Sequence, residues 1–123
     1  MPGAEKSILI IDPDITERTV MAAFLRSENF CVETGRSFAD AVNKMRRGCF
    51  KCLIMDVDLP EIKGYDAVSI LKSINPEIKI IMTAKKNTKS LEAKVRKQDI
   101  FFYFIKSFGK EELILAINNA FNK

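Results

Sequence analysis

The sequence has no histidine and only three cysteines among its 123 residues. A chain without histidine has no Ser-His or Cys-His nucleophile, none of the usual zinc sites and no histidine that carries a phosphoryl group. An odd number of cysteines suits a reducing compartment better than a disulfide framework. Cys49 and Cys52 form a C-x-x-C pair, but without a second ligand pair the pattern favours small residues in and beside a strand. The chemistry of this chain must therefore use carboxylates, lysines and hydroxyls.

Long apolar runs are also missing. No run approaches the roughly 20 residues of a membrane span, and the opening MPGAEKS lacks the basic and apolar blocks of a signal peptide. We therefore expect a cytoplasmic protein that does not engage a membrane. No linker, repeat or low-complexity segment divides the chain. We expect residues 1–123 to form a single domain, with no output domain in this chain, and 47% apolar residues suffice for its core.

The excess of positive charge is small. Twenty basic and sixteen acidic residues give a formal charge of +4 and a pI near 9.0. Because an excess of this size is common on ordinary protein surfaces, nucleic acid is not an expected partner. Several basic residues cluster where we expect a helix, and they are most simply a solvated face of it: Lys85, Lys86, Lys89, Lys94, Arg96 and Lys97.

Five apolar runs alternate along the chain with five stretches of helical spacing. Most of the runs are continuous, which is typical of strands covered on both faces in a parallel sheet. Short loops and right-handed crossovers then predict an α/β fold, a doubly wound five-stranded parallel sheet with five helices on its two faces. The expected strands are residues 7–11, 30–34, 52–55, 78–82 and 101–105, and the expected helices are residues 15–29, 37–47, 65–74, 87–98 and 110–121.

Four of the five expected strands end on a polar side chain, namely Asp12, Asp56, Thr83 and Lys106. The carboxyl ends of parallel strands are where open α/β sheets bind their ligands. If the first and third strands are neighbours, as in the strand order 2-1-3-4-5, the four side chains converge on one crevice. Asp56 is the most conspicuous of the four, because a buried apolar run leads straight into it.

The types of these four residues indicate phosphoryl transfer. Two carboxylates brought together repel each other unless a cation or a shared proton accompanies them. Hard oxygen ligands without histidine or thiolate favour magnesium over zinc. Such an ion could hold a phosphate against Asp56, while Lys106 offers positive charge and Thr83 a hydrogen bond to the phosphoryl oxygens. We therefore interpret Asp56 as a nucleophile that accepts a phosphoryl group.

The segments ILIID, LIMDVDLPEIKG, IIMTA and YFIKSF, in this order and at these separations, resemble the receiver domain of two-component response regulators. The resemblance covers residues 7–120 and implies a flavodoxin-like fold. It implies that Asp56 accepts a phosphoryl group from a histidine kinase or phosphotransfer protein, in a protein that is not an enzyme but takes part in its own phosphorylation and dephosphorylation. It also implies a magnesium ion held by Asp12, Asp56 and the backbone carbonyl of Asp58.

The same resemblance implies a signalling switch. The Thr83 hydroxyl would turn toward the phosphoryl group, and Tyr103 would change its rotamer beneath it. The last-helix face, which carries the fourth helix, the fifth strand and the fifth helix, would then bind a downstream protein partner. A homodimer is a further possible assembly. Phe102, beside Tyr103, is expected in the core, whereas an exposed Phe102 would indicate a face for a partner or for self-association.

Three positions depart from the usual pattern of this family. Pro13 replaces the second of two adjacent acids, the direct metal ligand, and proline has neither a carboxylate nor an N–H group, so the magnesium affinity is in question. Asp14 could substitute as a ligand, but we expect it to cap the first helix. Ser107 replaces a proline whose peptide bond is commonly cis, and we expect a trans or a strained bond here. Asp99 stands near the place of a usual glycine, which predicts a reshaped loop.

Asp58 and Lys85 stand where this family places residues that flank the phosphoacceptor and tune dephosphorylation. One interpretation is that the Asp58 carboxylate repels a phosphoryl donor or orients water, while Lys85 neutralises it. The other interpretation is that both are solvated side chains at the rim of the pocket.

Two functions follow from these observations. The first is a receiver that accepts a phosphoryl group on Asp56 and signals by a conformational switch to a protein partner. The second is a degenerate receiver that acts as a phosphorylation-independent interaction module, because Pro13 removes a metal ligand. A flavodoxin-like cofactor binder is disfavoured, since a flavin phosphate requires a first loop rich in glycine, hydroxyls and free N–H groups, whereas IDPDITER offers acids and a proline.

Overall fold

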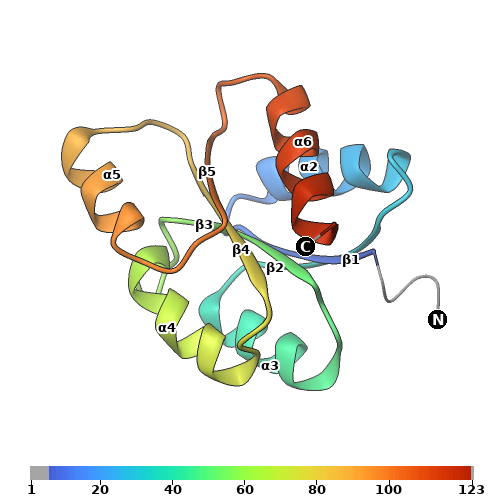
Figure 1. Cartoon of the computed structure of the whole chain (residues 1–123), viewed down its shortest axis with the longest axis horizontal. Helices are drawn as coiled ribbons and strands as arrows, with labels where there is room; N and C mark the ends of the chain where they lie inside the picture. The colour runs from blue at the N-terminus through green and yellow to red at the C-terminus, as the bar shows by residue number, and fades with distance from the viewer. Residues whose placement is uncertain (1–5, 123) are drawn as a thin grey trace.

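Five short strands, most of them buried on both faces, form the centre of the fold (Figure 1). The structure, a computed structural model, describes residues 6–122. The strands are β1 (Ser7–Ile11), β2 (Cys31–Gly35), β3 (Cys52–Asp56), β4 (Lys79–Ala84) and β5 (Phe102–Ile105), all parallel, in the sheet order β2-β1-β3-β4-β5. The helices are α2 (Ile15–Ser27), α3 (Phe38–Arg47), α4 (Gly64–Ile74), α5 (Lys89–Arg96) and α6 (Lys110–Phe121).

Successive side chains of each central strand enter two different cores. In β1, Leu9 and Ile11 belong to one buried cluster, whereas Ile8 and Ile10 belong to the other. This alternation follows from the two-residue period of a strand, and it explains why the strand sequences are continuously apolar. Both faces of the sheet therefore require a cover of helices.

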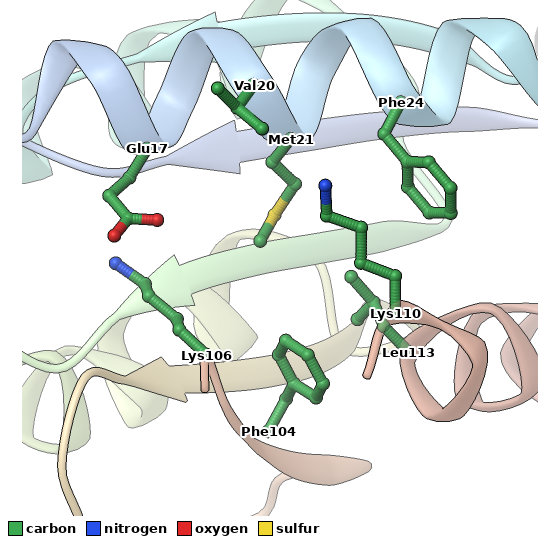
Figure 2. A pocket seen from close by; sticks show the side chains of 8 residues that line it. All are labelled: Glu17, Val20, Met21, Phe24, Phe104, Lys106, Lys110 and Leu113. Carbon is green, nitrogen blue, oxygen red and sulfur yellow. The ribbon is translucent and has the colours of Figure 1, made fainter. Parts of the chain in front are cut away.

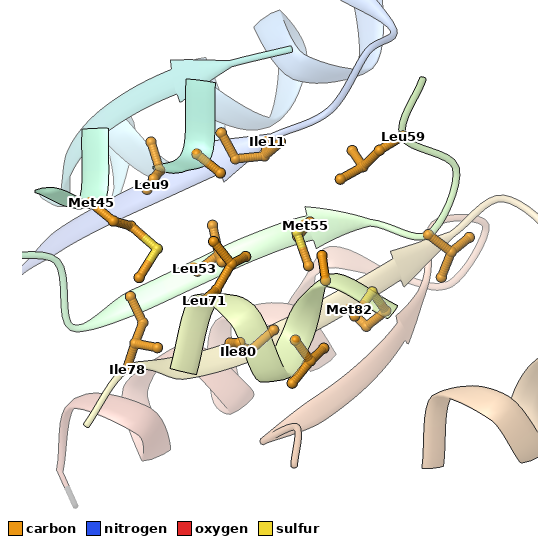
Figure 3. Packing of buried hydrophobic residues seen from close by; sticks show 14 of the residues in the cluster. Leu9, Ile11, Met45, Leu53, Met55, Leu59, Leu71, Ile78, Ile80 and Met82 are labelled. Carbon is orange, nitrogen blue, oxygen red and sulfur yellow. The ribbon is translucent and has the colours of Figure 1, made fainter. Parts of the chain in front are cut away.

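The helices form one layer on each face of the sheet. The first cluster joins the sheet to α3, α4 and α5, and Figure 3 shows Met45 and Leu71 from two of these helices packed over the strands. The second cluster joins the sheet to α2 and α6 through Leu25 and Ile117, among others. Within residues 6–122, none of the helices combines the length and the apolar character that crossing a membrane would require.

The register of the sheet aligns the carboxyl ends of its central strands. Ile11 at the end of β1 is paired with Met55 of β3, so Asp12 and Asp56 follow at the same level. Asp56 in turn is paired with Thr83 of β4, and Ala84 is paired with Ile105 of β5. The polar residues that end four strands therefore lie along one edge.

The expected architecture is confirmed in its strand order, its parallel direction and its five helices. Several expected boundaries are wrong by one or more residues. The first helix ends at Ser27 because Asn29 adopts a left-handed backbone conformation, with φ of 71°. The helix before β5 is the shorter α5, and Phe102 is partly buried against the α2 and α6 cluster, neither fully in the core nor fully exposed.

Candidate functional site

Four polar side chains meet at the carboxyl edge of the sheet. The Lys106 ammonium lies 2.6 Å from Oδ2 of Asp12 and 2.8 Å from Oδ1 of Asp56. The Thr83 hydroxyl donates to the same Asp56 oxygen at 3.3 Å. The structure thus brings together the four strand-end residues that the sequence singles out, in one group joined by a shared lysine.

Asp56 is positioned by the loop that follows it. The backbone N–H of Asp58 donates to Oδ2 of Asp56 at 2.9 Å, and the N–H of Val57 donates to the Thr83 carbonyl at 2.9 Å. Gly64 begins α4 directly beneath, where a Cβ would lie only 2.5 Å from the Asp56 carbonyl oxygen. A larger residue at Gly64 would therefore push α4 away from the end of β3, so this glycine permits the close approach.

Asp12 is held by different contacts. The N–H of Asp14 donates to Oδ1 of Asp12 at 2.9 Å, and the Arg18 guanidinium donates to the Asp12 carbonyl at 2.7 Å. Burial raises the pKa of Asp12 above its ordinary value, although hydrogen bonds from Lys106 and the Asp14 N–H oppose the rise. At Asp12, burial therefore outweighs the favourable contacts with Lys106 and with the Asp14 N–H.

Lys106 reaches the two carboxylates from the end of β5. Its side chain is only 6% exposed, and its backbone N–H donates to the Ala84 carbonyl at 2.8 Å. Burial disfavours the ammonium, but the hydrogen bonds to Asp12 and Asp56 outweigh burial and raise the pKa of Lys106 above its ordinary value. Lys106 is therefore charged over the ordinary pH range and binds both acids at once.

A small cavity adjoins Lys106 on the side of α2 (Figure 2). Its volume is about 40 Å³, and most of its lining is apolar. Figure 2 shows the Glu17 carboxylate of α2 pointing toward the Lys106 ammonium across this space. Glu17 is therefore a further acid near Lys106, and its place in the sequence did not predict this.

Asp14 caps α2, as the sequence predicts. One of its carboxylate oxygens accepts the N–H groups of Thr16 at 2.9 Å and Glu17 at 3.1 Å, and the other accepts a hydrogen bond from Lys85 at 3.4 Å. The hydrogen bond from Glu17 is the main cause of a lowered pKa of Asp14. Both oxygens are thus engaged with α2 and Lys85, which leaves Asp14 a poor substitute for the missing metal ligand.

The Asp58 side chain lies at the rim of the site. It is 73% exposed and pairs with Lys63 at 3.0 Å, while Lys85 pairs with Asp14 instead. The interpretation in which Lys85 neutralises Asp58 is therefore wrong for this structure. The interpretation of two largely solvated side chains agrees with their exposure.

Tyr103 lies one strand away from Thr83 in a separate polar network. Its ring is buried against α5, and its hydroxyl donates to Oδ1 of Asn87 at 2.9 Å. Asn87 donates to Glu92 at 2.7 Å, and the Arg96 guanidinium lies 5.8 Å from the centre of the Tyr103 ring. The residue expected to act as a rotamer switch is therefore linked to the loop before α5 and to α5 itself.

Sequence reasoning missed Glu61, which ties the loop after Asp56 to α3. Its two carboxylate oxygens accept the N–H groups of Phe38 at 3.0 Å and Ala39 at 3.2 Å, at the start of α3. The hydrogen bond from Phe38 is the main cause of a lowered pKa of Glu61, and the bond from Ala39 lowers it further. No sequence pattern announces this contact, because 22 and 23 residues separate the partners.

The C-x-x-C pair takes no part in the site. Cys52 is buried at the opposite end of β3, where burial raises the pKa of its thiol to about 12. Cys49 is exposed, and both thiols are free. The expectation of small residues in and beside a strand agrees with this placement, since a thiol with so high a pKa is a poor nucleophile.

The oxygen donors of the site are of the kind that magnesium prefers, but Pro13 removes the second of the two adjacent acids that the family pattern has after β1. Asp12, Asp56 and the carbonyl of Asp58 are hard ligands of the kind that Mg²⁺ prefers. Within residues 6–122, no group of three or more Asp, Glu, Cys or His side chains is placed to hold a metal ion. A magnesium ion would therefore depend on the two carboxylates that Lys106 binds here, and compete with that lysine for them.

The bond between Lys106 and Ser107 is trans, as is every other peptide bond from residue 6 to residue 122. This agrees with the expectation for a residue other than proline at that position.

Comparison with known proteins gives a consistent result. A family model described as the response regulator receiver domain matches residues 8–118. The response regulator protein TodT of Pseudomonas putida is 32% identical over 113 residues, which make up 92% of this chain and 50% of that protein. The response regulator protein TmoT of Ectopseudomonas mendocina is 28% identical over 123 residues, 98% of this chain and 54% of that protein. The chain thus spans about half the length of these two relatives.

Solved structures resemble the fold closely. The receiver domain of the sensor histidine kinase PA1611 from Pseudomonas aeruginosa, which has a magnesium ion coordinated in its active-site cleft, superposes with a TM-score of 0.87 at 22% identity, covering 96% of this chain and 98% of that one. A CheY-like receiver domain from Methanospirillum hungatei gives a TM-score of 0.87 at 20% identity, covering 95% of this chain and 94% of that one. At such identities the likeness establishes the fold alone.

Proposed function

The chain belongs to the response regulator receiver domain family, and on that premise we propose that it accepts a phosphoryl group on Asp56 from a histidine kinase or phosphotransfer protein. Receiver domains are signalling modules of two-component systems and are generally not enzymes. One observation carries the proposal: Lys106 and Thr83 both bind the carboxylate of Asp56 at the carboxyl edge of the sheet.

The proposed reaction is an in-line displacement at phosphorus. An oxygen of Asp56 forms a bond to phosphorus while the bond from phosphorus to the imidazole nitrogen of the donor breaks, and the leaving imidazole takes up a proton. The N–H of Asp58 and the Thr83 hydroxyl orient the carboxylate before the attack. The acceptor thus loses little conformational freedom when the reaction begins.

Lys106 is the proposed electrostatic partner of the transferred group. Its ammonium lies 2.8 Å from Asp56, within reach of oxygens on a phosphoryl group attached there. A buried, permanently charged donor of this kind stabilises the negative charge on the phosphoryl oxygens in the transition state. The Thr83 hydroxyl would donate a hydrogen bond to the same group. Tyr103, which contacts the loop before α5, would then change its rotamer.

Magnesium is the proposed cofactor, with Asp12, Asp56 and the Asp58 carbonyl as its protein ligands. When bound, the ion would screen the charges of the carboxylates and of the incoming phosphoryl group. Pro13 supplies no ligand, and Asp14 is engaged in capping α2. We therefore propose a weaker magnesium site than two adjacent acids would make.

We propose that the signal passes to a protein partner. Relatives named NtrC and ZraR are transcriptional regulators of which this chain covers about a quarter, and one fold neighbour is a receiver domain dimer. The transcriptional regulators support a downstream protein partner that binds the face carrying α6, and the dimeric neighbour supports a homodimer.

A small phosphodonor such as acetyl phosphate, with magnesium, tests the acceptor directly. Intact mass spectrometry should detect one phosphoryl adduct on the native protein and on a control with the exposed acid replaced, Asp66→Ala. The adduct should be absent from Asp56→Ala. An adduct that survives Asp56→Ala unchanged would overturn the assignment.

A degenerate receiver is the second candidate, and a specific observation favours it. Asp14, the acid directly after Pro13, accepts hydrogen bonds on both of its carboxylate oxygens, from α2 and from Lys85. A phosphorylation-independent module would form no adduct at any magnesium concentration, yet its partner binding would be unchanged in Asp56→Ala.

A further inference from the structure

The loop that connects β3 to α4 is fixed at its base. The N–H of Val57 donates to the Thr83 carbonyl at 2.9 Å, and the N–H of Gly64 donates to the Val57 carbonyl at 2.7 Å. Asp58 and Lys63 form an isolated antiparallel bridge across the loop, and their side chains pair at 3.0 Å. The two ends of the loop are therefore joined to each other and to β4, and the residues between Asp58 and Lys63 form its tip.

The tip of this loop is anchored to other parts of the molecule. Leu59 is buried in the same cluster as Ile11 of β1, and Figure 3 shows both side chains. The Glu61 carboxylate accepts the N–H groups of Phe38 at 3.0 Å and Ala39 at 3.2 Å, the first two residues of α3. These N–H groups have no partner within their own helix, so Glu61 satisfies both of them. Leu59 thus anchors the tip to the core, and Glu61 ties it to α3.

The backbone of Asp58 lies between the base and the tip of the loop. Its N–H donates to Oδ2 of Asp56 at 2.9 Å, and its carbonyl is one of the proposed magnesium ligands. The Asp58 side chain is 73% exposed, so packing of that side chain does not fix the backbone. The contacts on either side of Asp58 must do so. A hydrogen bond weakens steeply as its angle worsens, so a shift of the tip would weaken the bond to Asp56.

We propose that Glu61 is a positioning residue for the phosphoacceptor. By tying the tip of the loop to α3, Glu61 keeps the N–H of Asp58 directed at Asp56 and the Asp58 carbonyl in place for a magnesium ion. Glu61 binds α3 and acts on Asp56 only through the Asp58 backbone. The consequence for phosphoryl transfer rests on the proposed function, whereas the positioning of Asp58 does not.

Capping of α3 is the alternative, merely structural role of Glu61, and Ser37 offers the matched control. Ser37 is the N-cap residue of α3, and its hydroxyl accepts the N–H of Asp40 at 3.1 Å. Ser37→Ala removes a capping bond from the same end of the same helix but leaves the bonds of Glu61 in place. Glu61→Ala removes both bonds to α3, and Glu61→Gln keeps one acceptor oxygen. Circular dichroism would verify that the three variants fold.

Hydrogen exchange measured by NMR, without phosphodonor or metal, tests the positioning of Asp58. We expect the Asp58 amide to exchange about tenfold faster in Glu61→Ala and about threefold faster in Glu61→Gln, and at the native rate in Ser37→Ala. The Val57 amide, which is bonded to β4, is the internal reference and should not change. An unchanged Asp58 amide in Glu61→Ala, an equal acceleration in Ser37→Ala, or an equal acceleration of the Val57 amide would overturn the proposal.

The rate of adduct formation tests the consequence for phosphoryl transfer. With acetyl phosphate and one fixed magnesium concentration, intact mass spectrometry over time should show an adduct that forms about fivefold more slowly on Glu61→Ala than on the native protein. Glu61→Gln should recover part of the rate, and Ser37→Ala should keep all of it. The native rate in Glu61→Ala, or an equal loss in Ser37→Ala, would overturn the role in phosphoryl transfer. If the native protein forms no adduct, the proposed function fails, and hydrogen exchange still decides whether Glu61 positions Asp58.

Discussion

The loops after β1 and β3 begin with the same local structure and then diverge. Each has two aspartates separated by one residue, and in each the N–H of the second aspartate donates to the carboxylate of the first at 2.9 Å, in Asp12-Pro13-Asp14 and in Asp56-Val57-Asp58. Both first aspartates bind Lys106. The two strand ends are thus equivalent up to the second acid of each pair.

The two loops differ in the contacts of their second acid, Asp14 or Asp58, and of the residue between the acids, Pro13 or Val57. Asp14 caps α2, whereas Asp58 remains at the surface, and the capping of a helix passes to Glu61, which binds the start of α3. Val57 donates its N–H to the Thr83 carbonyl, a bond that Pro13 cannot make. The loop after β3 therefore contributes two backbone N–H groups, those of Val57 and Asp58, to the end of the sheet around Asp56, while the loop after β1 gives one carboxylate to a helix.

Removal of the shared lysine should have the largest effect. Lys106→Met would leave Asp12 and Asp56 buried without a cation, and breaking a buried ion pair in this way costs about 3 kcal/mol. Urea unfolding should show this loss of stability. The double variant with Asp12→Asn should recover part of it, because one of the opposed charges is gone. A loss below about 1 kcal/mol, or no recovery, would mean that Lys106 does not join the two strand ends energetically.

Restoration of the missing acid should make the two loops more alike. Pro13→Asp should bind magnesium about tenfold more tightly than the native chain, because a third carboxylate is added to the donor set. Isothermal titration calorimetry measures the affinity. Pro13→Ala is the matched control, since it restores the N–H without a carboxylate. If Pro13→Ala binds magnesium as tightly as Pro13→Asp, the weak affinity of the native chain is caused by the backbone geometry at Pro13 and not by the number of acids.

Glu61→Gln should weaken the tie between the loop after β3 and α3. The pKa of Glu61 is lowered in the folded state, so its contribution is complete above its unfolded value near 4.5 and disappears as the pH falls through the lower folded value. Allowing for solvent screening, we expect a loss of about 0.5 kcal/mol at neutral pH. Unfolding curves of the two proteins should converge as the pH falls below 4.5 and the Glu61 carboxylate takes up a proton. A difference that grows on acidification would contradict this role.

The smallest effect is expected at Asp58. Its pair with Lys63 is exposed, so Asp58→Asn should change the free energy of unfolding by less than about 0.5 kcal/mol. A much larger change in the unfolding midpoint would show that the second acid of this loop is structural, as Asp14 is in the other.

The sheet and the four strand-end residues could be predicted because they depend on local sequence. Strands buried on both faces must be continuously apolar, and the residue after each run must lie at the carboxyl edge. The capping role of Asp14 was likewise predictable from its place before a helical stretch. Arg18, Glu61 and Lys85 were not, because their partners depend on how flexible side chains cross between elements, over 71 residues in the case of Lys85 and Asp14.

The proposal that Asp56 accepts a phosphoryl group with the help of a weak magnesium site is tested by the magnesium dependence of the adduct. Intact mass spectrometry after incubation with acetyl phosphate should be carried out over a series of magnesium concentrations, for the native protein, Pro13→Asp and Asp56→Ala. We expect an adduct on the native protein and on Pro13→Asp, with the native protein requiring about tenfold more magnesium, and no adduct on Asp56→Ala. An adduct on Pro13→Asp but none on the native chain at any magnesium concentration would show that Asp56 is held in the right place by a site that no longer accepts phosphate.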